Sequence, residues 1–176
     1  MTGTLTVISG PMFSGKSTYL INKSLECEKK IIINHSLDKR YSTNSICTHS
    51  RLSTPSISLD NLTDIINTEN FEQADNIFID EAQFFSNLYA VVLNIIKNTN
   101  KNLFIAGLLI DFESNVFGEL LYLIPLADHH ISLKGKCYLC HNPSLFSSKI
   151  TENKSQIDVG TFNSYQPLCT NHYLNK

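Results

Sequence analysis

The sequence lacks several features that mark whole classes of protein. No apolar run approaches the roughly 20 residues that a membrane-spanning helix needs, so we expect no membrane partner. The chain has 14 basic and 16 acidic residues, and a net charge of −2 provides no basic field for extended binding to nucleic acid. The N-terminal residues also lack the charged, apolar and small-residue regions of a secretory signal.

Cysteine is scarce and odd in number, with five residues in 176. An odd count that includes a C-x-x-C pair is typical of a metal site in a reducing compartment rather than of a disulfide framework. We therefore expect a cytoplasmic protein. A hydrophobic content of 42% is enough for the core of one α/β domain with a small appendage.

Short apolar runs alternate with helical patterns along the first two thirds of the chain. Runs at 4–9, 29–34, 76–80 and 102–108 favour parallel strands that are covered on both faces. Helical spacing of apolar residues predicts helices at 17–30 and 87–100. The residues expected on their apolar faces are Leu20, Ile21 and Leu25 in the first helix, and Leu88, Val91, Val92, Ile95 and Ile96 in the second. The polar, Ser- and Thr-rich residues 35–60 predict a long loop.

The stretch GPMFSGKST at 10–18 fits the pattern G-x-x-x-x-G-K-[ST] of a phosphate-binding loop, or P-loop. Gly10 and Gly15 would let backbone N–H groups turn toward phosphate oxygens. Lys16 would bring a positive charge to the β- and γ-phosphates, and the Ser17 hydroxyl can ligate Mg²⁺. The predicted strand before the loop and the helix after it are the context that the motif requires. A glycine turn that binds nothing would leave Lys16 as an idle charge.

Two carboxylates end the apolar run IFIDEAQFF at 77–85. In P-loop enzymes an Asp at such a strand end supports Mg²⁺, which indicates Asp80 for that role. Glu81 would then lie beside the γ-phosphate, where a general base is needed. The alternative is the start of a helix, where acidic residues are also favoured. The pair alone does not distinguish a base that activates water from one that activates a substrate hydroxyl.

Two close ligand pairs lie near the C-terminus. Cys137 and Cys140 form a C-x-x-C, and Cys169 and His172 form a C-x-x-H. Two such pairs are the usual way to build a tetrahedral Zn²⁺ site, and four protein ligands leave no position for a catalytic water. We therefore predict a structural zinc; the alternative is a set of buried cysteines without a metal.

These segments together resemble the zinc-containing (type II) thymidine kinases. The resemblance is carried by GPMFSGKST, by LDKRYST at 37–43 with CTHS at 47–50, and by IDEAQFF at 79–85. It continues in GLLIDFESNVFG at 107–118 and in IDVGTFNSYQPLCTNHY at 157–173. It implies a P-loop (RecA-like) parallel sheet flanked by helices over residues 1–130, and a zinc-binding subdomain with a nucleoside-closing loop over 131–176. His172 stands where many members have a fourth cysteine, and histidine is an accepted zinc ligand.

The resemblance also implies a role for individual residues. Glu81 would be the general base, and Ser17, Asp38 and Asp80 would serve Mg²⁺. The implied ATP-binding residues are Gly10, Pro11, Met12, Phe13, Ser14, Gly15, Lys16, Ser17, Asp38, Lys39, Arg40, Asp80 and Gln83. The implied nucleoside-binding residues are Met12, Phe85, Leu108, Phe112, Phe117 and Tyr165, with the main chain of Gln156, Ile157, Asp158, Val159 and Gly160 on the pyrimidine. Taken alone, Phe112 and Phe117 would be read as core aromatics.

The resulting hypothesis is a kinase that transfers the γ-phosphoryl group of Mg-ATP to thymidine or deoxyuridine in pyrimidine salvage. The resemblance implies feedback inhibition by dTTP and a homotetramer. We also expect residues 151–168, which are polar and tied at both ends to the zinc ligands, to close over the nucleoside. Two alternatives are a nucleic-acid-stimulated ATPase, since D-E-A-Q is similar to the acidic motif of helicase-type motors, and a zinc-ribbon adaptor with an inactive P-loop. The ATPase would need a second motor domain and a basic track for the strand.

Overall fold

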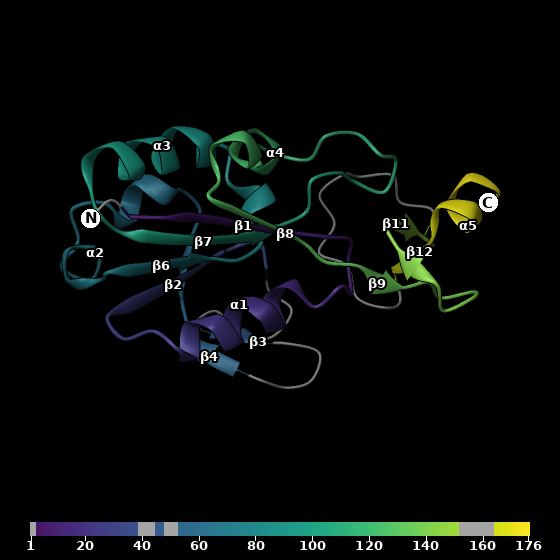
Figure 1. Cartoon of the computed structure of the whole chain (residues 1–176), viewed down its shortest axis with the longest axis horizontal. Helices are drawn as coiled ribbons and strands as arrows, with labels where there is room; N and C mark the ends of the chain where they lie inside the picture. Colours follow the sequence, from purple (N-terminus) through teal and green to yellow (C-terminus); the bar gives the residue numbers. More distant parts are fainter. Residues whose placement is uncertain (1–2, 39–44, 48–52, 152–163) are drawn as a thin grey trace.

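A six-stranded parallel sheet forms the centre of the protein (Figure 1). The computed structural model describes residues 3–38, 45–47, 53–151 and 164–176. The strand order is β5-β2-β6-β7-β1-β8, and each neighbouring pair is parallel. The strands are β1 (Leu5–Ser9), β2 (Lys30–His35), β5 (Ile57–Leu59), β6 (Asn76–Ile79), β7 (Asn102–Gly107) and β8 (His129–Ser132). The predicted parallel α/β sheet is confirmed, and the four predicted apolar runs are its four inner strands.

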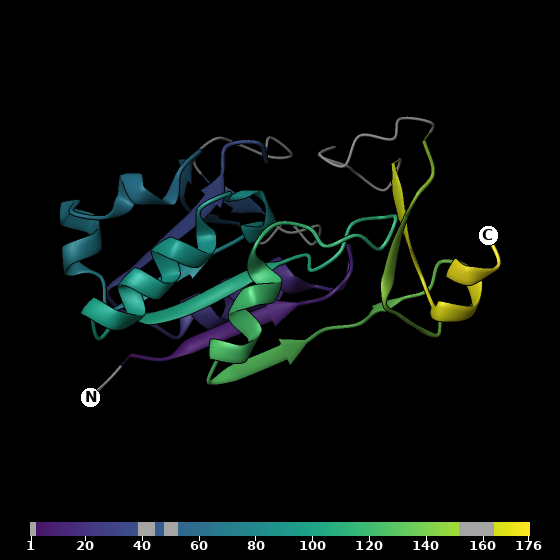
Figure 2. The same cartoon turned by 90° about the horizontal axis from the view of Figure 1, so that it is seen from above.

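Helices cover both faces of the sheet, as continuous apolar strands require (Figures 1 and 2). Alternate side chains of β1 show the two layers: Val7 belongs to the larger core with α3, and Ile8 belongs to the smaller core with α1. The helices are α1 (Lys16–Leu25), η1 (Leu62–Ile65), α2 (Glu69–Gln73), η2 (Ala82–Phe84), α3 (Leu88–Asn98), α4 (Leu120–Leu123) and η3 (Ile124–Leu126). Among the helices of the described residues, none is long and apolar enough to cross a membrane.

The apolar faces of two helices are narrower than predicted. Leu25 is 62% exposed at the end of α1, and Ile96 is 37% exposed on α3. Helix α1 also ends at Leu25 rather than at residue 30. The reason is that Lys30 pairs with Asn76 as the first residue of β2, so the chain must leave the helix and turn through Lys29, which has a positive φ of 40°. Strand pairing therefore prevails over the helical pattern there.

The prediction of a long loop over residues 35–60 is wrong in its described part. The structure has β3 (Ser45–Cys47) paired with β4 (Ser53–Pro55), and β5 at the edge of the main sheet. The hydroxyls of Ser56 and Ser58 donate to Asn34 Oδ1, so the polar side chains of this segment find partners on β2. Serine-rich composition here marks an edge strand with satisfied polar groups.

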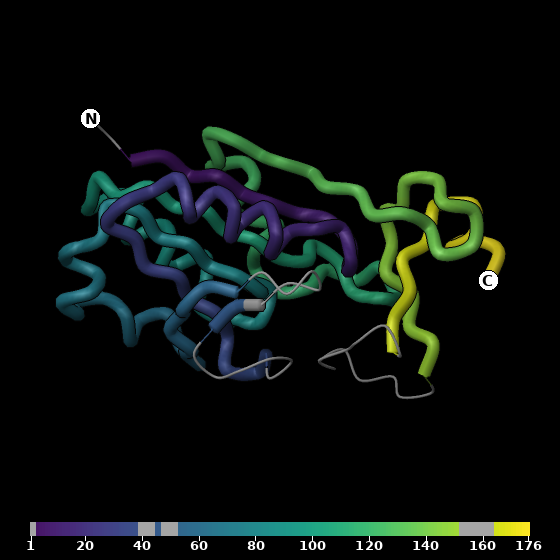
Figure 3. Tube along the Cα trace, turned by 90° about the horizontal axis from the view of Figure 1, so that it is seen from below, coloured from purple at the N-terminus to yellow at the C-terminus, as the bar shows by residue number. Residues whose placement is uncertain are grey.

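A smaller unit follows β8 and lies beyond the carboxyl ends of the central strands (Figures 1 and 3). It consists of two antiparallel pairs, β9 with β10 and β11 with β12, and a terminal helix. The elements are β9 (Gly135–Lys136), β10 (Pro143–Ser144), β11 (Phe146–Lys149), β12 (Tyr165–Leu168) and α5 (Thr170–Leu174). β8 crosses residue 130, where we placed the boundary between two units; the division itself stays a prediction.

Candidate active site and metal centre

The P-loop joins β1 to α1 at the carboxyl edge of the sheet. Gly15 precedes the first helical residue with φ of 88°, a left-handed conformation that favours glycine. At Gly10 a Cβ would lie 2.5 Å from the carbonyl oxygen of Leu133, so a side chain has no room there. Lys16 is 8% exposed, and its Nζ donates to the carbonyl oxygen of Pro11 at 2.8 Å. The loop thus holds a buried cation, as the motif predicts.

The hydroxyl oxygen of Ser14 is buried inside this loop and has no hydrogen-bond partner among the residues that the structure describes. Buried polar atoms are nearly always satisfied, so an orphaned hydroxyl indicates a place where a polar ligand completes the site. Phosphate oxygens would accept from this hydroxyl and from Lys16. The residues therefore fit a bound polyphosphate.

The acidic pair leaves the sheet at the same edge as the P-loop. Ile79 of β6 pairs with Ile105 of β7, and Ser9 of β1 pairs with Gly107, so Glu81 lies about level with Ser9. With β7 between them, β6 and β1 are two strand spacings apart, about 10 Å. Asp80 is 2% exposed. The acidic pair and the P-loop therefore both leave the sheet at its carboxyl edge.

Glu81 has a strained backbone. Its φ of 51° and ψ of 40° put a non-glycine residue in the left-handed region, which costs about 1 kcal/mol or more. The residue caps the short helix η2, but its side chain accepts no hydrogen bond from the backbone N–H groups of that helix. Instead, its carboxylate Oε2 accepts from Gln83 Nε2 at 2.6 Å. The helix-start interpretation of the acidic pair is thus partly right, but the carboxylate is directed elsewhere.

Asp38 lies in the turn after β2, where its backbone N–H donates to the carbonyl oxygen of His35 at 2.9 Å. His35 is buried, and its Nδ1 accepts from the backbone N–H of Leu37 at 3.1 Å. Burial lowers the pKa of His35 from 6.5, against the opposing effect of Asp60. Two neighbours of Asp38 in the prediction, Lys39 and Arg40, lie outside the described residues.

The loop after β7 carries the predicted nucleoside residues and is organised by a buried aspartate. Asp111 Oδ1 accepts from the backbone N–H groups of Glu113 and Asn115, both at 2.9 Å. The turn brings Phe112 toward the C-terminal unit, where its ring centroid lies 6.3 Å from that of Tyr165. Lys149 Nζ lies 5.0 Å and 5.4 Å from these two ring centroids. Phe112 and Tyr165, two predicted substrate residues from distant parts of the chain, thus lie close together and share the ammonium group of Lys149.

The other described residues of the predicted nucleoside site have different surroundings. The backbone N–H of Met12 donates to Ser147 Oγ on β11 at 2.9 Å, and β11 pairs with the strand of Tyr165. Phe117 packs edge-on against Phe84, and Phe85 is fully buried against His35. Leu108 is 8% exposed at the end of β7. Residues Gln156, Ile157, Asp158, Val159 and Gly160, and most of the proposed closing segment, lie outside the described residues.

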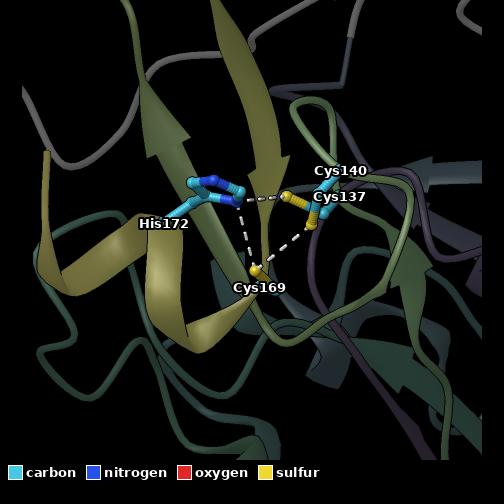
Figure 4. Close-up of side chains that lie close together, drawn as sticks. All are labelled: Cys137, Cys140, Cys169 and His172. Atoms are coloured by element: carbon cyan, nitrogen blue, oxygen red, sulfur yellow. Dashed lines mark hydrogen bonds between the residues drawn. The ribbon is translucent and has the colours of Figure 1, made fainter.

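Four metal-binding side chains converge in the C-terminal unit (Figure 4). The two sulfurs of Cys140 and Cys169 are 3.7 Å apart, and His172 Nδ1 lies 3.5 Å from Cys137 Sγ and 3.4 Å from Cys169 Sγ. A tetrahedral ion with Zn–S of about 2.3 Å and Zn–N of about 2.0 Å gives edges of about 3.8 Å and 3.5 Å. The four cysteines that the structure describes in full are free thiols. The cluster therefore has the ligands and the dimensions to bind zinc.

The pKa values of two thiols in this cluster are shifted in opposite directions. Burial alone would raise the pKa of Cys137, but backbone N–H groups of Cys169, Leu139 and Cys140, together with His172, lower it to about 6. The pKa of Cys140 is raised despite the backbone N–H of Asn142, because burial and the neighbouring thiols oppose a second charge. A metal ion would remove this conflict, since it binds the thiolate forms.

A family model described as thymidine kinase matches residues 3–173, nearly the whole chain. The chain belongs to the thymidine kinase family. Three thymidine kinases illustrate how widely the similarity extends. The protein of Oryza sativa subsp. japonica is 35% identical over 98% of this chain, which spans 66% of the rice protein. The Fowlpox virus (strain NVSL) protein is 34% identical over 95% of this chain and 94% of its own length. The Pseudothermotoga lettingae protein is 31% identical over 98% of this chain and 96% of its own length.

Within this member of the thymidine kinase family, the contacts of Asp111, of the pair Ser147 and Lys149, and of Tyr173 were absent from the sequence predictions. Asp111 could have been found, because an aspartate whose carboxylate accepts from the backbone two residues later is a typical turn signal. Ser147 and Lys149 carry no such signal, because their role comes from contacts with residues 12 and 112. Tyr173 is a third case: its hydroxyl donates to the carbonyl oxygen of Phe112 at 2.8 Å and so joins α5 to the loop after β7.

Proposed function

We propose that this member of the thymidine kinase family transfers the γ-phosphoryl group of ATP to the 5′-hydroxyl of thymidine or deoxyuridine. The observation that carries the proposal is the acidic pair of buried Asp80 and partly buried Glu81, at the same sheet edge as the P-loop in a chain that matches the family over residues 3–173. The nucleoside oxygen bonds to the γ-phosphorus while the bond to the β-phosphate oxygen breaks, which gives ADP and dTMP from thymidine, or dUMP from deoxyuridine. The hydroxyl proton passes to the Glu81 carboxylate.

The residues of the P-loop bind and neutralise the triphosphate. Lys16 approaches the β- and γ-phosphates, and the Ser14 hydroxyl donates to a phosphate oxygen. Ser17, Asp38 and Asp80 would hold Mg²⁺, which neutralises charge on the phosphates when it is bound. We also include Lys39, Arg40 and Gln83 in the proposed ATP site, because the sequence motifs that contain them resemble those of the family. Most of the acceleration comes from positioning and electrostatics.

The nucleoside lies between the α/β unit and the zinc unit in this proposal. The contact of Phe112 with Tyr165 supports it, since the two rings come from opposite units and offer flat apolar surfaces to a base and a sugar. Met12, Phe85, Leu108 and Phe117 complete the pocket, with the main chain of 156–160 on the pyrimidine. A zinc held by Cys137, Cys140, Cys169 and His172 stabilises the unit that carries Tyr165 and takes no part in the chemistry.

Regulation, assembly and location belong to the same proposal. We infer feedback inhibition by dTTP, which carries the nucleoside of the product and the triphosphate of ATP in one molecule. A homotetrameric, cytoplasmic enzyme of pyrimidine salvage is the form that the resemblance to the family supports.

The test is ADP release with thymidine, with single-stranded DNA and with neither. Thymidine-dependent release with formation of dTMP is expected; stimulation by DNA alone would contradict the proposal and favour a motor ATPase. Glu81→Gln keeps the shape of the side chain but removes the base, and should lower kcat by about 10²–10⁴ with little change in ATP affinity. Glu72→Gln, an exposed residue of α2, is the matched control. Wild-type turnover in Glu81→Gln would overturn the assignment of the base.

A further inference from the structure

Gln83 is a buried side chain whose amide connects the carboxylate of Glu81 to the end of β7. It is 3% exposed. Its Oε1 accepts from the backbone N–H of Leu108 at 2.9 Å, and its Nε2 donates to Glu81 Oε2 at 2.6 Å. The two contacts fix the direction of the amide: an N–H group can only pair with the carbonyl end, which leaves the NH₂ end for the carboxylate. We propose that Gln83 is a positioning residue that orients Glu81 and keeps it ionised.

The surrounding backbone is shaped to hold this amide. A Cβ at Gly107 would lie 2.6 Å from Gln83 Oε1 and 3.2 Å from the backbone nitrogen of Ala82. A Cβ at Gly118 would lie 2.3 Å from the carbonyl oxygen of Gln83, and Gly118 also has a positive φ of 66°. Glycines on two separate segments thus let the backbone approach Gln83 from both sides. The side chain is enclosed by the carboxyl end of β7 and the start of the nucleoside loop.

Two physical consequences follow for Glu81. A donor on the carboxylate favours its charged form, which is the form that can take a proton from a hydroxyl. The contact also restrains the side chain of a residue whose backbone is held in the left-handed region. Leu108 belongs to the predicted nucleoside pocket. The amide of Gln83 therefore links the general base, Glu81, to the strand end that carries this pocket. The inference rests on the proposed function, in which Glu81 is the general base.

The experiment is the pH dependence of kcat/KM for thymidine in Gln83→Glu and Gln83→Met. Gln83→Glu keeps the acceptor for Leu108 but puts a second carboxylate against Glu81. The fall of kcat/KM at low pH (the acid limb of the profile) should therefore shift to higher pH by about one unit or more. Gln83→Met keeps the approximate shape of the side chain and removes the donor to Glu81. The acid limb should again shift to higher pH, by less than in Gln83→Glu. A role in packing alone would lower the melting temperature and leave the limb in place.

The chain offers a matched control in α2. Gln73 Nε2 donates to Glu69 Oε1 at 2.9 Å, which is the same amide–carboxylate pair on an exposed helix. Gln73→Glu makes the identical change of charge and should leave the pH profile unchanged. Gly107→Ala alters no polar group but displaces Gln83 Oε1, so it should reproduce the shift of Gln83→Met. If the acid limb of both Gln83 variants coincides with that of the wild type, the inference about Gln83 is overturned. The proposed function still stands in that case if Glu81→Gln is inactive.

A measurement without turnover separates this inference from the proposed function. The carboxyl carbon of Glu81 is titrated by NMR in protein labelled at glutamate, and its signal is assigned by its loss in Glu81→Gln. The pKa of Glu81 should rise in Gln83→Met relative to wild type, whether or not thymidine is the substrate. An unchanged pKa would show that the amide does not stabilise the carboxylate and would overturn the inference on its own.

Discussion

Replacing Cys140 by serine should release the zinc and unfold the C-terminal unit while the α/β sheet stays folded. Serine keeps the size of the side chain but does not offer a thiolate to the metal. Apart from Pro167, the hydrophobic side chains that the described part of this unit buries are Cys137, Tyr165 and Leu168. So small a core cannot fold alone, and a structural metal must replace the missing hydrophobic stabilisation.

The size of the effect follows from the geometry of the cluster. Four ligand atoms lie within 4.8 Å of one another, so each provides about a quarter of the coordination. Structural zinc contributes about 10–16 kcal/mol in small zinc-binding peptides, which gives about 2.5–4 kcal/mol per ligand. At about 1.4 kcal/mol per tenfold change, Cys140→Ser should weaken zinc binding by about 10²–10³.

The assay is competition for zinc with a chromophoric chelator, together with elemental analysis, which should find one zinc per chain in the wild type. Amide exchange after chelation should rise in 135–150 and 164–176 and stay slow in β1, β6 and β7. Cys27→Ser is the control, because Cys27 is a free, half-buried thiol packed against the core under α1. Equal zinc affinity in the two variants, or a folded C-terminal unit without metal, would refute the reasoning.

The remaining predictions concern phosphate binding, the nucleoside pocket and pH. Lys16→Ala should raise the ATP KM and lower kcat, whereas Lys23→Ala on the exposed face of α1 should change neither in steady-state assays. Tyr165→Ala should raise the thymidine KM more than the ATP KM, and the opposite ratio would place the nucleoside elsewhere. Because burial lowers the pKa of His35, the unfolded chain binds a proton below pH 6.5 that the folded chain does not, so the free energy of unfolding should fall as the pH drops below that value. Urea titrations at pH 7.5 and 5.5 measure this fall in the free energy of unfolding, which should be smaller in His35→Asn than in the wild type. An equal fall in both proteins would exclude His35 as the cause of the pH dependence.

Local patterns in the sequence predicted the parts of the site that local chemistry determines. Lys16 belongs to a P-loop pattern between a strand and a helix, and this local motif indicates a phosphate site. The zinc cluster was predicted because two C-x-x-C/H spacings bring ligands together within one turn each. The contact between Met12 and Ser147 could not be predicted, since it joins residues 135 positions apart and neither residue type requires the other. The orientation of Gln83 depends on Gly107 and Gly118, which only the fold brings together. The edge strand β5 was missed because the hydroxyls of Ser56, just before it, and Ser58, within it, are satisfied by Asn34 on another strand.

The order in which the chain is synthesised gives the contacts between the two units a further meaning. All six strands of the central sheet are present once residue 132 has been made. The hydrogen-bond partner of Met12 is then still 15 residues away at Ser147, and the tyrosine that holds Phe112 follows at residue 173. A nascent protein can therefore complete its phosphate-binding half before the other wall of the proposed nucleoside pocket exists. If the cluster binds zinc as proposed, its last ligand, His172, is also among the last residues to be made, so the metal site can be completed only after this wall has been synthesised.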